Sequence, residues 1–600
     1  MDQKHWFNRI VNGTLRLLLA GVVFLLLLHS VFSTSFVGRL VLEDGSERER
    51  TFNIADSPLR HFIVFLVLTA ALLAGKRIAK MLRKRFPARR RDMVFWGLTL
   101  FTAAAGCAYV LMTKLHPSSD PAKVFAIAMQ WRQGDFSAFD VEGYLFRYPF
   151  QSGIILFYYL LSFLFGVDNF VGPQLVNVIC LAAIYGLLVK QFGLFSSLGG
   201  KEEKERLQTA VYLGVLLWVP LSFYVTYLYG ILPGMALSLG AVYFAGRYLL
   251  TRRYRYIAAA SLCMGLATVI KMNCLIYLIA IACFLVWDAL EQLCRRKKDA
   301  GRKWAVSLLF IACMVVGVAL CTSLSNRLVE RICGRELGEG EVMLSWVVMG
   351  MQEAPLGPGG YNGYNSEVFT ENNYDTEKIT EACLEDLGKI VTRMSANPLD
   401  EGLPFLARKT AFQWNDPTFI CLDRTRGRKG DADMPLWLKS LIEGRSGVKL
   451  SVFLNYMQTL ILLGVLLFLL LRWRSGNLYE LMGAVIFLGG WLFHLFWESS
   501  ASYTIPYFLI LIPYGVWGMA EWTVFLEKMA KRLREQTGPE KLSLGRRQLV
   551  TAVLAAVFIL LLAAFIRTNL FDRTIALNDD YNGIDASAQF YQTGQWDRGY

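Results

Sequence analysis

The stretch that decides the fold is LRLLLAGVVFLLLLHSVF, residues 15–32. Two further runs of the same kind are MVFWGLTLFTAAAGCAYVLM (93–112) and LVTAVLAAVFILLLAAFI (549–566). Each approaches the roughly 20 apolar residues that a helix needs to cross about 30 Å of hydrocarbon. With 54% hydrophobic and 18% charged residues, the chain is predicted to be an all-α polytopic membrane protein. The first run is predicted to be a retained spanning helix, because no small-residue cleavage site clearly follows it.

The net charge of +14 comes from Lys and Arg residues in short loops between apolar runs. The basic loops include KRIAKMLRKRFPARRR (76–91) and CRRKKDAGRK (294–303). Such loops stay on the cytoplasmic side of a membrane, so this charge indicates orientation and no nucleic-acid partner. The N-terminus is then cytoplasmic, and the loops 114–151 and 324–449 are extracytoplasmic.

The predicted organisation has about 13 crossings, with 14 as an alternative, because segment 152–166 is short for a span and is expected to be partly embedded. Residues 257–290 are too long for one crossing and should form a hairpin that turns near KMN (271–273). The expected units are an N-terminal transmembrane hairpin (1–75), a transmembrane core (76–323), an extracytoplasmic loop domain (324–449), C-terminal transmembrane helices (450–566) and an extracytoplasmic tail (567–600).

The first candidate for chemistry is Asp120, in SSDP (118–121). The pattern predicts a helix start, with Asp120 as N-cap and Pro121 at the first helical position. Catalysis is compatible with this ordinary role, since the positive end of a helix keeps a carboxylate ionised. The helix carries apolar residues at i, i+3, i+4 and i+7 from Val124, which suits a helix lying in the membrane interface.

Two further candidates lie next to predicted spans. Lys271 is the only charged residue between Arg255 and Asp288, so it either snorkels at an outer turn or binds a lipid phosphate. Glu498 follows His494 by one helical turn where a helix should reach the outside. The simpler interpretation of Glu498 is an ordinary carboxylate at a helix end.

Cofactor and disulfide signals are few. The sequence has no zinc-type cysteine spacing, no phosphate-binding glycine loop and no nucleophile elbow. The acidic pair in DAD (431–433) lies in a charged loop, so no metal or other cofactor is predicted, and a divalent metal stays an unsupported alternative. Cys333, Cys383 and Cys421 lie in one loop and could pair, although their odd number argues against a full disulfide framework.

Four motifs carry a resemblance to a known family. They are SDPAKVFAIAMQWRQGDF (119–136), YLFRYPFQSGIILFYYLLSFLFG (144–166), VIKMNCLIYLIA (269–280) and HLFWESSASYTIPYF (494–508). Over about residues 93–525 the chain resembles the GT-C membrane glycosyltransferases. It is most similar to bacterial members of the type of glycosyltransferase family 39, which includes protein O-mannosyltransferases and the aminoarabinose transferases of lipid A.

This resemblance implies a GT-C-like fold in a bacterial cytoplasmic membrane, with an extracytoplasmic active site. It implies transfer of a sugar, with inversion, from a polyprenyl-phosphate donor to a hydroxyl of a cell-envelope glycan, lipid or protein. Asp120 would be the base, and Lys271 and Arg147 would bind the donor phosphate. The expected substrate cleft holds Tyr148, Gln151, Glu498, His494 and Tyr503.

Two alternatives share the many helices. One is a transporter or flippase of a lipid-linked glycan, with Lys271, His494 and Glu498 lining its pathway. Such proteins often show two related halves, and no such symmetry is found in this sequence. The other is a polymerase or ligase of surface polysaccharide, which would use the same kind of donor.

Overall fold

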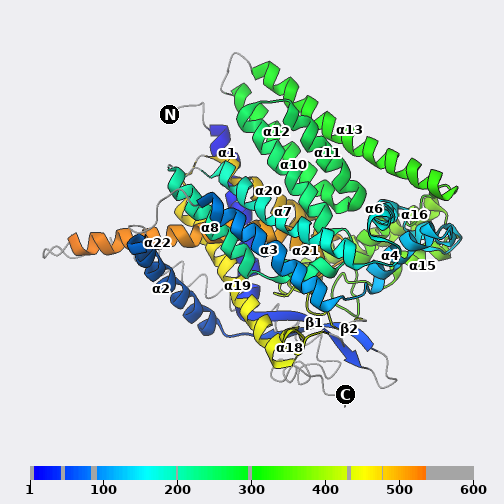
Figure 1. Ribbon diagram of the computed structural model, residues 1–600, viewed down its shortest axis with the longest axis horizontal. Helices are drawn as coiled ribbons and strands as arrows, with labels where there is room; N and C mark the ends of the chain where they lie inside the picture. Colours follow the sequence, from blue (N-terminus) through cyan, green and yellow to red (C-terminus); the bar gives the residue numbers. More distant parts are fainter. Residues whose placement is uncertain are drawn as a thin grey trace.

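Helices make up almost the whole of the computed structural model (Figure 1), which describes residues 6–41, 47–82, 91–196, 200–294, 300–426, 428, 434–442, 444–475 and 477–535. Within these ranges nine helices are long and apolar enough to cross a membrane, or up to eleven if each of two bent helix pairs counts as one span. The multi-pass helical class is thus confirmed, whereas the described residues do not reach 13 crossings. The predicted span 549–566, the tail 567–600 and the DAD motif lie outside them.

The first half of the chain contains helices joined by short turns and one β-hairpin. The elements are α1 (Trp6–Phe32), β1 (Ser33–Val41), β2 (Glu47–Ala55), α2 (Pro58–Leu82), α3 (Arg91–Thr113), α4 (Ser119–Arg132), α5 (Tyr144–Arg147), α6 (Ser152–Phe165), α7 (Val171–Phe195), α8 (Lys201–Leu217), α9 (Pro220–Phe223), α10 (Ile231–Thr251), α11 (Arg255–Ile270), α12 (Leu275–Cys294) and α13 (Ala300–Cys333).

The second half begins with helices of the predicted loop domain and then returns to spanning helices. The elements are α14 (Leu344–Gly350), α15 (Tyr364–Glu371), α16 (Thr376–Ala396), α17 (Leu403–Trp414), α18 (Leu436–Ile442), α19 (Gly444–Leu471), α20 (Met482–Phe496), α21 (Ala501–Phe508) and α22 (Ile512–Glu535). Short 3₁₀ turns include η4 (Pro149–Gln151), η5 (Tyr224–Thr226), η6 (Met272–Cys274) and η9 (Leu478–Leu481). The side chain of Asp375 caps the N-terminus of α16 by accepting from the N–H groups of Glu377 and Lys378.

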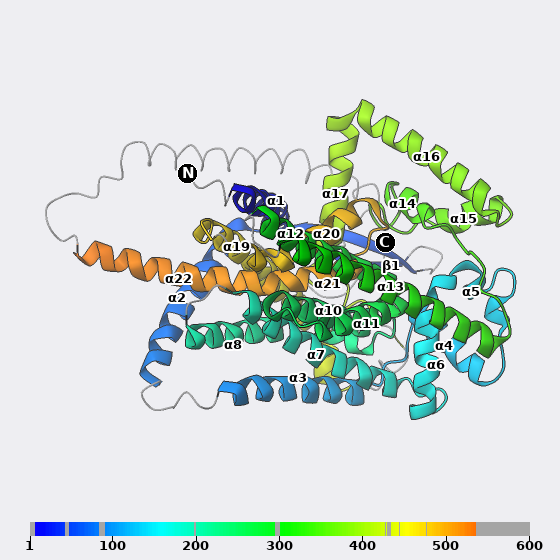
Figure 2. The same cartoon turned by 90° about the horizontal axis from the view of Figure 1, so that it is seen from above.

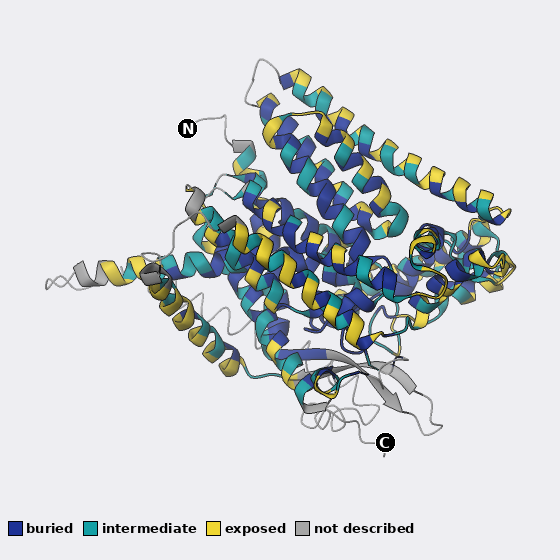
Figure 3. Cartoon of the chain, viewed as in Figure 1, coloured by how far each residue is buried: buried dark blue, intermediate teal, exposed yellow. Residues whose placement is uncertain are grey.

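The main core lies where α1, α7, α10, α12 and α19–α22 pack together. Peripheral helices look different: α2 and α13 each turn a largely exposed, apolar surface outward (Figure 3). Leu320 of α13, for example, is 65% exposed. In a polytopic protein such faces are the ones that contact lipid. Figure 2 shows α4–α6 and α14–α17 gathered at one end of the helix bundle.

Several helices break within the bundle. The segment Ser137–Arg147 and the segment Pro149–Phe165 are bent by 100° relative to each other, and α6 has only 14 residues, so the short helix expected at 152–166 is confirmed. The chain also breaks at KMN, where a hairpin turn is expected, because α11 ends at Ile270 and α12 starts at Leu275. These breaks place polar residues at the end of the bundle where α4 starts.

The segment between α1 and α2 forms a β-hairpin. Strands β1 and β2 pair antiparallel, from Ser33 opposite Ala55 to Val41 opposite Glu47. Its base is tied to distant helices: Asn415 Nδ2 donates to the Ser33 carbonyl (2.9 Å) and Asn455 Nδ2 donates to Asp56 Oδ2 (2.6 Å). These partners lie several hundred residues away, so local sequence did not reveal them.

The tightest helix crossing in the bundle joins α19 to α22. A Cβ atom added to Gly518 would lie 1.7 Å from the Gly464 carbonyl oxygen, and one added to Gly464 would lie 2.3 Å from the Gly515 carbonyl oxygen. The two backbones are therefore in direct contact, as small residues permit between membrane helices.

The substitution Gly518→Ala should lower the free energy of unfolding by roughly 1–3 kcal/mol, because the new methyl group collides with backbone that cannot move away. Thermal unfolding of the purified protein in detergent measures this. The control is Gly21→Ala on α1, where nothing lies within 4 Å of the added Cβ, so helix propensity alone should make it neutral or stabilising by up to about 1 kcal/mol. Equal unfolding midpoints for the two variants would contradict the close crossing.

Candidate functional site

Four segments that are distant in sequence meet at the end of the bundle beside α4. They are the start of α4, the turn after η5, the α11–α12 junction and the break between α20 and α21. The side chains that they contribute, Asp120, Tyr229, Lys271, Glu498 and Tyr503, are named here the acid–lysine cluster. Asp120 and Lys271 both act electrostatically on Glu498, and Asp120 also acts on Tyr229. Three of the predicted motifs therefore converge on one place.

Asp120 is not the N-cap that the sequence suggested. Helix α4 already begins at Ser119, after Ser118 in extended backbone, so Asp120 falls in the first turn. A proline is tolerated anywhere in the first turn, where backbone N–H groups have no partner in the helix, and Pro121 therefore does not fix the helix start. The Asp120 carboxylate is 53% exposed and lies 3.8 Å from Lys123 Nζ.

The apolar face of α4 is confirmed, but its partner is protein. Val124, Ile127 and Trp131 are buried in a cluster with Ile155 and Tyr158 of α6. A position of α4 in the membrane interface stays a prediction. Packing against α6 fixes the helix, and with it the position of Asp120.

Lys271 stands at the junction of α11 and α12. Its ammonium lies 4.1 Å from the centroid of the Tyr229 ring, a cation–π contact. Burial lowers the pKa of Lys271 to about 8, against the opposing influence of nearby acidic groups that include Asp120 and Glu498. Gln151 Nε2 donates to the Tyr229 hydroxyl (2.9 Å), so Gln151, predicted as a substrate-cleft residue, joins the cluster through Tyr229.

Glu498 lies in the extended break between α20 and α21. The Tyr503 hydroxyl donates to its Oε2 (3.5 Å). Burial, reinforced by the Asp120 carboxylate, raises the pKa of Glu498 to about 7, although Lys271 and Arg424 act in the opposite direction. Near neutral pH this carboxyl group can therefore either accept or release a proton.

The sequence predicts that His494 and Glu498 lie one turn apart on the same helix face, and this prediction is wrong. Helix α20 ends at Phe496, so Glu498 lies beyond the helix and the one-turn spacing does not apply. The His494 ring is fully buried and lies against the rings of Tyr503 and Tyr507, with centroid distances of 6.1 and 5.7 Å. The His494 ring therefore packs against the Tyr503 ring and helps to hold it in place.

Arg147 faces the segment that precedes α14, and Tyr148 faces α14 itself. Arg147 Nη1 lies 4.0 Å from Glu341 Oε1, and the Arg147 carbonyl accepts from the Glu341 N–H (2.9 Å). The Tyr148 ring contacts Trp346, with a centroid distance of 6.2 Å. Tyr144, one turn earlier, faces the acid–lysine cluster instead and shares a hydrogen bond with Tyr229. A phosphate-binding role for Arg147 stays a prediction.

Two cations near the cluster were missed by sequence reasoning. Arg424 acts electrostatically on both Glu498 and Tyr503. Lys409 of α17 is fully buried, and burial lowers its pKa to about 7. Arg424 lies in the charged stretch DRTRGRK (423–429), and Lys409 follows Arg408 in the mixed helix LPFLARKTAFQW (403–414), so neither stands out as a lone charge.

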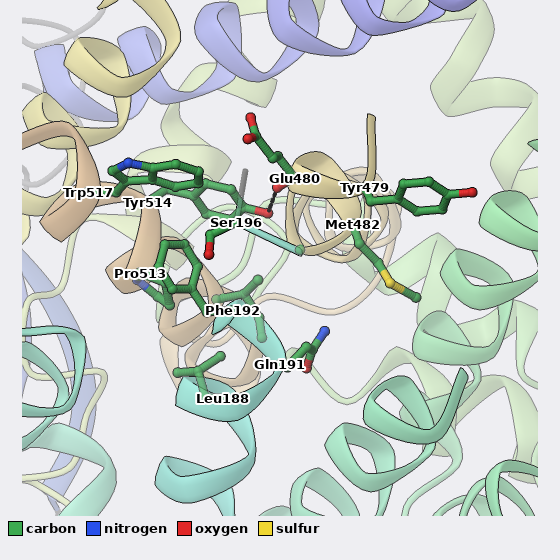
Figure 4. Close-up of a pocket in the computed structure, with 12 residues that line it drawn as sticks. Leu188, Gln191, Phe192, Ser196, Tyr479, Glu480, Met482, Pro513, Tyr514 and Trp517 are labelled. Carbon is green, nitrogen blue, oxygen red and sulfur yellow. Dashed lines mark hydrogen bonds between the residues drawn. The ribbon is translucent and has the colours of Figure 1, made fainter. Parts of the chain in front are cut away.

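A small cavity lies elsewhere, between α7, η9 and α22 (Figure 4). It shares no lining residue with the acid–lysine cluster. Its charged residue, Glu480, is paired with Arg472 (3.0 Å) and Arg16 (3.7 Å). The cavity is lined by Leu188, Gln191, Phe192, Ser196, Tyr479, Glu480, Met482, Gly483, Ile510, Pro513, Tyr514 and Trp517. Its walls offer packing and paired charges, and no group poised for chemistry.

Cysteines and metal ligands add no further site within the described residues. All eleven cysteines are free. Cys333, Cys383 and Cys421 are buried in three different hydrophobic clusters, so these three do not pair with one another. The described ranges contain no group of three or more His, Cys, Asp or Glu residues placed to hold a metal ion.

The pKa of Glu498 predicts a pH dependence of stability. Because this pKa rises from an ordinary 4.5 to about 7 on folding, the folded state binds the proton more tightly. The resulting stabilisation is complete below pH 4.5 and is lost as the pH rises through 7. Relative to Glu498→Gln, the wild-type unfolding temperature should therefore fall between pH 5 and pH 8. A wild-type-minus-variant difference that stays constant over this range would contradict the assignment.

The chain matches no protein-family model, and comparisons with curated proteins and with solved structures found no match. The structure establishes a polytopic helical membrane protein, with nine to eleven candidate spans in the part of the chain that it describes.

Proposed function

We propose that this chain is a membrane glycosyltransferase with a GT-C-like fold. In this proposal it moves a sugar from a polyprenyl-phosphate donor to an acceptor hydroxyl on the extracytoplasmic side of a bacterial cytoplasmic membrane. The observation that carries the proposal is the convergence of Asp120, Lys271 and Glu498 from three distant segments. Such a transfer needs a base for the acceptor and a cation for the departing phosphate, and this cluster holds both kinds of group.

The reaction can be written with these side chains in named roles. The Asp120 carboxylate accepts the proton of the acceptor hydroxyl while that oxygen forms a bond to the anomeric carbon of the sugar. The bond from the anomeric carbon to the phosphate oxygen breaks, and its electron pair stays on the polyprenyl phosphate. Lys271 stabilises the negative charge that develops on this leaving group. Attack from the face opposite the phosphate inverts the anomeric centre.

The partly exposed Asp120 suits an acceptor that arrives from outside the membrane, whereas Lys271 lies at the start of the apolar helix α12. Met272, Leu275 and Ile279 follow Lys271 on an exposed face of that helix. A lipid-linked donor could therefore place its phosphate at Lys271 while its tail stays in the bilayer.

The course of α13 bears on the side of the membrane that the cluster faces. This helix follows the basic loop 294–303, starts at the far end of the bundle and ends near α4–α6 and α16 (Figures 1 and 2). This arrangement supports an extracytoplasmic position for the cluster.

The first test uses Asp120→Asn. Loss of the base should lower turnover by a factor on the order of 10²–10⁴, measured as release of free polyprenyl phosphate from a panel of polyprenyl-phosphate sugars with a cell-envelope extract as acceptor. The matched control is Asp140→Asn in the same loop, since Asp140 is exposed and pairs with Arg335 at the surface (3.6 Å); it should keep full turnover. Full activity of correctly folded Asp120→Asn would contradict the assignment of Asp120 as the base.

The second test uses Lys271→Met. Removing the cation should lower turnover by on the order of 10²–10³ and weaken donor binding more than acceptor binding. Lys389→Met is the control, because Lys389 is exposed and pairs only locally with Glu385 and Asp386.

The products of the same assay separate the alternative functions. Transfer of a whole glycan from the lipid donor, in place of one sugar, would point to a polymerase or ligase. If no donor is turned over and lipid-linked glycan crosses vesicles instead, the protein is a transporter.

A further inference from the structure

Lys409 holds a position that the proposed reaction does not use. Its side chain is fully buried on α17, and its ammonium donates hydrogen bonds to two backbone carbonyls, those of Gly350 and of Trp497 (2.8 Å to the latter). Gly350 is the last residue of α14 and Trp497 is the C-cap of α20. Carbonyls at helix C-termini lack helical partners and carry the negative end of the helix dipole. One lysine thus joins the ends of two helices.

Two more contacts fasten the same pair of segments. The Ser499 N–H donates to the Gly359 carbonyl (2.7 Å). The indole rings of Trp346 and Trp497 stack at a centroid distance of 6.2 Å with planes only 4° apart. The 344–360 segment, which belongs to the predicted loop domain, is therefore attached to the 497–500 break on either side of Glu498.

The charge of Lys409 also reaches the acid–lysine cluster. Glu498 acts electrostatically on Lys409. The other charged or titratable groups that face Glu498 are Asp120 from α4, Lys271 from the α11–α12 junction, Arg424 from the segment after α17, and Tyr503 from α21. A buried ammonium is costly, and a neutral donor would make similar hydrogen bonds to carbonyls. The choice of a lysine here, in place of a neutral donor, points to a role for the charge that it carries at and below its pKa of about 7.

We propose that Lys409 is a positioning residue for Glu498: it fixes the break between α20 and α21 so that the Glu498 carboxylate faces Lys271 and Asp120, and its positive charge favours the ionised form of that carboxylate. This inference rests on the proposed function only for its effect on turnover. The geometry and the charge effect can be tested without any substrate.

The experiment compares Lys409→Met, which removes the donor and the charge, with Lys409→Gln, which keeps a donor and removes the charge. The readout is the pH midpoint of Glu498 protonation, followed by its carboxyl band in infrared difference spectra against the same protein carrying Glu498→Gln. In both variants the pH midpoint of Glu498 protonation should rise by at least about 0.5 pH unit. A nearby cation stabilises the ionised carboxylate, and both substitutions remove that cation. Turnover should fall about tenfold, with its pH profile displaced in the same direction. Arg408→Met is the matched control, since Arg408 is the neighbouring cation on α17 and its charge pairs with Glu353 (2.6 Å).

A purely structural role would lower the unfolding temperature and leave the Glu498 midpoint and the pH profile unchanged, and that result would overturn the proposal. If Lys409→Met fails to fold, Lys409→Gln decides the matter, because its amide can still hydrogen-bond a carbonyl. Absence of transferase activity in the wild type would remove the proposed function. The infrared midpoint would still support or overturn the role of Lys409.

Discussion

Backbone carbonyls at broken helices are the constraint on which the acid–lysine cluster depends. In an apolar environment every unpaired carbonyl costs several kcal/mol, so breaks persist only where protein groups satisfy them. At the break after α20 the donor is Lys409. At the turn around η5, Gln174 Nε2 donates to the carbonyls of Leu115 (2.7 Å) and Thr226 (3.3 Å), and Asn177 Nδ2 donates to that of Val225 (3.0 Å). Polar side chains from distant parts of the sequence thus satisfy the backbone carbonyls of the turns at which the site residues lie.

The two ends of the bundle use charge differently. Away from the acid–lysine cluster, Arg472 bridges Glu480 (3.0 Å) and Glu521 (3.1 Å), and Arg252 pairs with Asp288 (2.6 Å). Removing one partner of such a buried pair costs about 3–5 kcal/mol, although the intact pair adds little net stability. These pairs fix which helices are neighbours. The acid–lysine cluster instead combines acidic groups with shared cations, so that Glu498 can change its protonation state near neutral pH.

Part of the candidate site could be found in the sequence because each residue carried a local signal. Lys271 stood out as a lone charge in an apolar run, Asp120 as an acid before a helix, and Glu498 as an acid after one. Their meeting at one place could not be derived from these signals. Arg147 carried a similar signal, yet the fold pairs it with Glu341. Lys409 carried none, because it follows Arg408 in a short mixed helix, where a pair of basic residues looks like an ordinary solvated face.

The sequence by itself determined the class of protein, since apolar length and loop charge are local properties that any spanning helix must satisfy. It also determined several breaks, such as the one at KMN, because a charged residue interrupts an apolar run there. Only the tertiary structure decided how the helices pack: the β-hairpin tied to Asn415 and Asn455, the backbone contact of Gly518 with Gly464, and the partners of Lys409. Each of these joins residues from different segments, and such pairings depend on helix packing, which no local pattern encodes.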